Sequence, residues 1–110
     1  MNSNKKKRLE QAGWVTGSAA DFLGLDDEES RFIEMKLALA AGVRELRVKR
    51  GLTQTALATR LKSSQSRVAK MEAGDRSVSL DLLVRSLLSV GASSAEIAKW
   101  IKRADAARAA

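Results

Sequence analysis

The sequence contains no cysteine and no histidine. Disulfides and thiolate metal sites are therefore excluded, and the commonest general base of enzymes, which is also the commonest transition-metal ligand, is missing. Enzymes can work with carboxylates, lysine and serine alone, but these absences argue against an enzyme, and we expect neither a metal nor a cofactor. Proline is absent as well, so no proline ring interrupts a helix.

Long apolar runs are missing too. No stretch approaches the ~20 residues that span a bilayer. The basic stretch at residues 4–8 is not followed by the apolar segment of a signal peptide. A chain of 110 residues, 45% hydrophobic and 30% charged, is typical of one soluble domain with tails. We therefore expect a cytoplasmic protein with no membrane partner.

Positive charge is in excess and unevenly placed. The net charge is +7, which makes a polyanion the first partner class to consider. Residues 44–76 contain nine basic and three acidic side chains, a net charge of +6. Residues 21–34 contain six acidic side chains and one arginine, a net charge of −5. We expect these two stretches to meet different partners.

The pattern of caps and apolar residues predicts five main helices and no strand, an all-α fold. The longest covers about 27–50, because Asp26 and Glu29 have capping-box spacing and apolar residues recur at helical intervals. Thr53, Ser64, Ser79 and Ser93 are the expected N-caps of the others. Those helices should end near residues 61, 73, 90 and 107. Residues 18–23 are expected to form one further helical turn.

The stretch from Leu46 to Leu83 contains many features at fixed spacing. They are Leu46-Arg47, Gly51-Leu52-Thr53-Gln54, Leu57-Ala58, Ser64-Gln65-Ser66, Val68, Met71-Glu72-Ala73-Gly74, Ser79-Leu80 and Leu82-Leu83. With these residues the chain resembles the Xre family, the lambda-type repressor and Cro domains, over about residues 36–91. The resemblance implies a lambda-repressor-like five-helix helix-turn-helix domain over 27–110, preceded by an N-terminal extension over 1–26.

The turn of this motif departs from the family in one place. Two short helices joined by such a turn cross steeply, with Leu57, Ala58 and Leu61 of the first meeting Val68 and Met71 of the second. Lys62 stands where many relatives have glycine. If this position needs a positive φ, lysine is strained there by roughly 1 kcal/mol. The alternative is that the turn adopts another geometry.

The resemblance implies that the helix beginning at Gln65 enters the major groove of double-stranded DNA. The expected base contacts are Gln65, Ser66, Arg67 and Lys70, because glutamine suits adenine while arginine and lysine suit guanine. The expected phosphate contacts are Gln54, Ser64, Arg76 and Ser77, with Gln54 in the place of the family's phosphate clamp. Arg47 and Glu72 match positions that form a salt bridge in lambda-type repressors. Arg60 and Lys49 are interpreted as merely solvated.

The residues before this core suggest a more specific role. Gly13-Trp14, residues 19–25 and the acidic helix start, together with residues 65–72 and 77–80, make the chain similar to HigA-like antitoxins of type II toxin–antitoxin modules. This resemblance implies a repressor of its own operon that neutralises a small basic toxin of the RelE type. The expected toxin-binding residues are Trp14, Phe22, Asp26, Asp27, Glu28, Glu29 and Phe32. In the alternative, these acids only cap a helix, and the protein is a stand-alone or prophage repressor.

Apolar residues of the last helix have two interpretations. Ile97, Trp100 and Ile101 recur at the spacing of one helix face. They either complete the core or form the interface of a homodimer. A dimer is expected on a DNA operator, because one recognition helix contacts too few bases.

Overall fold

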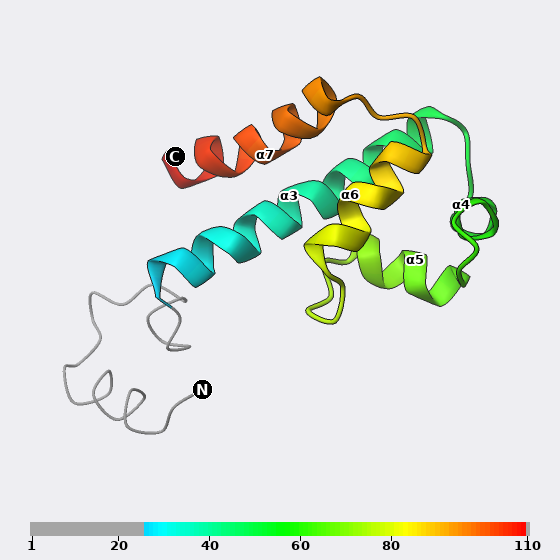
Figure 1. Ribbon diagram of the computed structural model, residues 1–110, viewed down its shortest axis with the longest axis horizontal. Coiled ribbons are helices and arrows are strands. Elements are labelled where there is room, and N and C mark those ends of the chain that lie inside the picture. Colours follow the sequence, from blue (N-terminus) through cyan, green and yellow to red (C-terminus); the bar gives the residue numbers. More distant parts are fainter. Residues whose placement is uncertain (1–25, 110) are drawn as a thin grey trace. The chain divides into compact units, whose positions relative to one another are not determined.

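The computed structural model describes residues 26–109 (Figure 1), and they form five helices with no strand. The helices are α3 (Asp27–Lys49), α4 (Gln54–Arg60), α5 (Gln65–Glu72), α6 (Leu80–Ser89) and α7 (Ser94–Ala109). The all-α class is therefore confirmed over this part of the chain. The helical turn expected at 18–23, and the expected toxin-binding residues Trp14 and Phe22, lie outside the described residues.

The chain divides into two compact units, Met1–Ile33 and Glu34–Ala110, which are described separately. In the first unit the described residues are the start of α3. The Asp26 carboxylate accepts a hydrogen bond from the Glu29 amide at 2.7 Å, and so caps the helix. Asp27, Glu28 and Glu29 occupy the first turn, where negative charge interacts favourably with the helix dipole.

The helices of the second unit begin at the predicted caps. The hydroxyls of Thr53, Ser64 and Ser79 each accept a hydrogen bond from the amide three residues on, at 3.0, 3.1 and 3.1 Å. Ser93 and Glu96 form the predicted reciprocal capping box, with bonds of 3.1 and 3.0 Å. Each cap stabilises its helix by about 1 kcal/mol. These side chains therefore explain where four of the helices start.

The turn between α4 and α5 has the strained geometry anticipated for Lys62. Its φ is +56°, and it is the one non-glycine residue with a positive φ in the described chain. The Lys62 amide donates to the Thr59 carbonyl at 3.1 Å, and the Ser63 amide donates to the Ala58 carbonyl at 2.8 Å. The hydrogen bonds that end α4 thus hold Lys62 in the left-handed region, which disfavours a side chain with a Cβ.

The core of the second unit combines residues of all five helices. Leu39 and Val43 of α3, Leu57 of α4, Val68 and Met71 of α5, and Leu83 and Leu87 of α6 are essentially inaccessible to solvent. As predicted, the facing apolar surfaces of α4 and α5 meet there, and Ala58 is 3% exposed. This buried face fixes which side of α5 remains outside.

The helix α7 packs along α3 and completes the core. Trp100 lies over Gly42, so closely that a Cβ added to this glycine would be 2.6 Å from the indole ring. Ile97 and Trp100 are 9% and 7% exposed, and Ile101 packs against the core at its edge. The structure thus favours the first interpretation of this apolar stripe. These residues belong to the core of their own chain, which leaves them little surface for a second copy.

Candidate nucleic-acid interface

The helix α5 has one buried face and one exposed face. Val68 and Met71 are completely buried against α4 and the rest of the core. The side chains expected to contact bases, Gln65, Ser66, Arg67 and Lys70, are all exposed. Because three of these four lie in the first turn, the N-terminal end of α5 presents donors and acceptors to the outside. This is the end that helix-turn-helix proteins direct at base edges.

Five of the expected DNA contacts gather around one hollow. It has a volume of about 280 Å³, and its lining consists of Ser64, Ser66, Arg67, Lys70, Ser77 and Val78. These residues come from α5, from its N-cap Ser64 and from the loop between α5 and α6. Two cationic groups and three hydroxyls in one concave patch suit an anionic group such as a phosphate. Arg76 is exposed in the same loop but outside this lining.

The loop beside the hollow is organised by a carboxylate. Asp75 Oδ1 accepts a hydrogen bond from the Ser77 amide at 2.9 Å and one from the Ser77 hydroxyl at 2.6 Å. These bonds, with smaller contributions from the charges of Lys70 and Lys36, lower the pKa of Asp75. The hydroxyl proton of Ser77 is therefore already engaged. Ser77 reaches a phosphate as a donor only if it releases Asp75.

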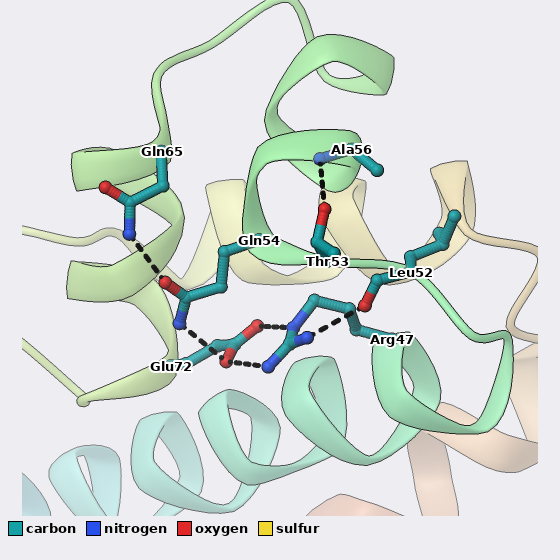
Figure 2. A network of polar contacts seen from close by, with 7 residues as sticks. All are labelled: Arg47, Leu52, Thr53, Gln54, Ala56, Gln65 and Glu72. Atoms are coloured by element: carbon teal, nitrogen blue, oxygen red, sulfur yellow. Dashed lines mark hydrogen bonds and ion pairs between the residues drawn. The ribbon is translucent and has the colours of Figure 1, made fainter.

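A buried ion pair connects α3 with the end of α5 (Figure 2). Arg47 donates two hydrogen bonds to Glu72, from Nε to Oε2 at 2.6 Å and from Nη2 to Oε1 at 3.0 Å. A third bond runs from Nη1 to the Leu52 carbonyl at 2.8 Å. The two side chains are 13% and 5% exposed, and the bond to Glu72 raises the pKa of Arg47. The ion pair expected from the resemblance is thus present, in the bidentate geometry that makes such pairs strong.

Two glutamines extend this pair to the surface. Gln54 Nε2 donates to Glu72 Oε1 at 3.2 Å, and Gln54 Oε1 accepts from Gln65 Nε2 at 2.7 Å. The expected phosphate contact and one expected base contact are therefore bonded to each other and to the ion pair (Figure 2). The sequence pattern predicts separate roles for these residues and not their connection. One signal was available, because Gln65 and Glu72 are seven residues apart and so share a helix face.

Other site types are not found in the described part of the chain. Among residues 26–109 no group of acidic residues is placed to hold a metal ion. No helix there is long and apolar enough to cross a membrane.

The comparison with protein families agrees with this geometry. Residues 43–85 match the family described as "Helix-turn-helix". The match begins within α3, ends within α6 and includes α4 and α5 completely. Over these residues the chain therefore matches a helix-turn-helix of the Xre, lambda-repressor-like type, which is a DNA-binding regulatory domain. No curated protein and no solved structure matches the chain.

Proposed function

We propose that this helix-turn-helix domain makes the protein a sequence-specific transcriptional regulator, with α5 in the major groove of its operator. The observation that carries the proposal is the two-sided character of α5. Val68 and Met71 fix the helix on α4, while Gln65, Ser66, Arg67 and Lys70 point outward with donor and acceptor groups. These are residue types that distinguish bases at their major-groove edges.

The hollow beside α5 suggests which side chains contact the DNA backbone and which contact bases. In our proposal Ser64 meets a phosphate oxygen there, and Ser77 does so once its hydroxyl releases Asp75, while Arg67 and Lys70 extend from the hollow towards base edges. Phosphate contacts position a protein on DNA without specifying the sequence. Gln54 has a second N–H group besides the one donated to Glu72, and this group is available to a phosphate.

Selection from a random duplex library, followed by fluorescence anisotropy, tests the proposal. The protein should enrich one sequence, and Lys70→Ala should weaken binding to that sequence more than to a scrambled duplex, by about 1–3 kcal/mol. The matched control is Lys99→Ala, which removes the same charge from an exposed position on α7. If both variants lose equal affinity for both duplexes, Lys70 contributes only charge and its assignment to a base fails.

A homodimer is part of the proposal. Each chain carries one recognition helix, so a palindromic operator with half-sites about one helical turn apart, roughly 34 Å, gives two copies equivalent contacts. Sedimentation of the protein–operator complex measures the stoichiometry. Two chains per duplex support the homodimer, and a single chain that protects only one half-site contradicts it.

A second proposed function is that of a HigA-like antitoxin, which the exposed acidic start of α3 favours. Asp26, Asp27, Glu28 and Glu29 are all exposed there, and Phe32 is 47% exposed. Negative charge beside an aromatic side chain suits a basic protein partner, since aromatic residues are enriched among interface hot spots. With Trp14 and Phe22, these residues form the proposed toxin-binding segment.

Co-expression with the product of an adjacent small reading frame tests the antitoxin proposal. Replacing Glu28 and Glu29 by lysine should abolish neutralisation of a toxic product and leave operator binding unchanged. The control is Asp105→Lys, a charge reversal at an exposed position on α7. A protein that binds its operator but protects from no neighbouring product is a stand-alone repressor.

A further inference from the structure

A chain of hydrogen bonds runs from the buried ion pair to the exposed tip of the recognition helix (Figure 2). From Arg47 it passes through Glu72 and Gln54 to Gln65. The geometry points to Glu72 as a positioning residue that sets, through Gln54, which end of the Gln65 amide faces the DNA. This inference rests on the proposed function, in which Gln65 contacts a base.

Glu72 can only accept hydrogen bonds. Both of its oxygens receive bonds from Arg47, at 2.6 and 3.0 Å, and its side chain is 5% exposed. A carboxylate that receives guanidinium N–H groups on both oxygens acts as an acceptor and offers no donor. Any amide in contact with Glu72 must therefore present its NH₂ group.

This requirement fixes the orientation of Gln54. Its Nε2 lies 3.2 Å from Glu72 Oε1, so its carbonyl oxygen turns towards Gln65 and accepts from Nε2 there at 2.7 Å. In a reversed Gln54 amide, a carbonyl would face the carboxylate and an NH₂ group would face the NH₂ of Gln65. Both bonds would be lost at once, because one contact would join two acceptors and the other would join two donors.

The orientation of Gln54 determines which groups Gln65 offers to DNA. One N–H of its amide is donated to Gln54, which leaves the carbonyl oxygen and a second N–H for a base. One acceptor beside one donor matches adenine, which presents the N6 amino group and N7 in the major groove. A reversed amide would present its NH₂ group outward, which suits the two acceptors of guanine, O6 and N7. The series of hydrogen bonds from Glu72 to Gln65 therefore favours adenine over guanine at this position.

The base preference of protein variants tests the inference. The probe is the duplex selected by the wild-type protein from a library randomised over about 20 base pairs. The base pair under Gln65 is the one whose preference Gln65→Ala removes. The wild type should prefer adenine to guanine there by roughly 5- to 150-fold, the range of a good bidentate contact. Gln54→Ala and Glu72→Gln should reduce this ratio to a few-fold, because neither leaves an obligatory acceptor in place.

A double variant shows whether Glu72 sets the orientation of the two amides or only supports the fold. With Gln54→Glu and Glu72→Gln combined, the new amide can donate to the new carboxylate while its carbonyl accepts from Arg47. The carboxylate at position 54 can only accept from Gln65, so the adenine preference should return. Total affinity should fall, since a negative charge is added near the phosphates. The control is Val43→Ala, which removes buried methyl groups but none of the hydrogen-bonded side chains, and should leave the ratio unchanged.

The outcomes are distinct. The inference is overturned if Gln54→Ala and Glu72→Gln keep the adenine preference that Gln65→Ala loses, or if Val43→Ala abolishes it too. A wild-type protein that selects no sequence would instead contradict the proposed function. The polarity is then still measured in the free protein by NMR of the Gln65 side-chain amide. One of its two Nε2 protons should be shifted downfield in the wild type and in the double variant, and not in Gln54→Ala. Shifts of both protons equal to those of an unbonded glutamine amide in the wild type would refute the polarity directly.

Discussion

The Arg47–Glu72 pair leads to a quantitative prediction, because its burial decides how much it contributes to stability. Glu72→Ala removes the partner of two guanidinium bonds and leaves only the bond to the Leu52 carbonyl. Breaking a buried pair from one side costs about 3–5 kcal/mol, since the remaining charge stays buried. We expect a value near the lower end, because Arg47 keeps one bond and is 13% exposed. For a domain of this size, about 3 kcal/mol lowers the melting temperature by roughly 12–24 °C.

The chain provides a matched control for this prediction. Arg103 and Glu45 also form a close pair, at 2.7 Å, but their side chains are 51% and 50% exposed. Arg103→Ala should therefore cost less than about 1 kcal/mol. Urea and thermal denaturation followed by circular dichroism measure both variants. If Glu72→Ala and Arg103→Ala destabilise the protein equally, burial does not govern these pairs and the reasoning is wrong.

Three further predictions follow from single features of the fold. Lys62→Gly should stabilise the protein by about 1 kcal/mol in urea denaturation, because glycine adopts the observed φ of +56° without strain. Unchanged stability would show that Lys62 is not strained in this turn. Gly42→Ala should destabilise it by about 1–3 kcal/mol and shift tryptophan fluorescence, because the added methyl would collide with Trp100; a variant as stable as the wild type would contradict the close approach of α3 and α7. The Ser93 amide and hydroxyl lower the pKa of Glu96 below its ordinary value of 4.5, so the contribution of Glu96 to stability is present above pH 4.5 and is lost as the pH falls through the lowered pKa. The stability of Glu96→Gln should therefore fall less steeply with acid than that of the wild type. An equal dependence of stability on pH in both proteins would rule out this contribution.

The starts and stops of the helices were predictable because their causes are local. Each cap joins a side chain to an amide three residues away, so Thr53, Ser64, Ser79 and Ser93 are visible as patterns in the sequence. The strain at Lys62 was one of two alternatives, because the resemblance pointed to glycine at this position in many relatives and left the geometry of the turn open. These features depend on a few consecutive residues and not on the packing of the whole domain.

The polar chain behind α5 could not be derived in the same way. Its bonds join residues separated by 25, 18 and 11 positions, and they form only when α3, α4 and α5 are packed together. The apolar stripe of α7 was ambiguous for a similar reason. A core and a dimer interface both use residues such as Ile97 and Trp100, and their burial together with the contact of Trp100 with Gly42 favours the core. The hydrogen bonds between Asp75 and Ser77 were not predicted, although the two residues are only two positions apart.

Methylation interference on the selected duplex tests the central claim most directly, that α5 recognises bases in the major groove. Dimethyl sulfate modifies guanine N7 in the major groove and adenine N3 in the minor groove, and these positions report on the two grooves separately. The account predicts that N7 methylation within each half-site blocks binding, that N3 methylation there does not, and that Lys70→Ala relieves the block at one guanine. Interference confined to adenine N3, or a pattern that no substitution on α5 alters, would contradict it.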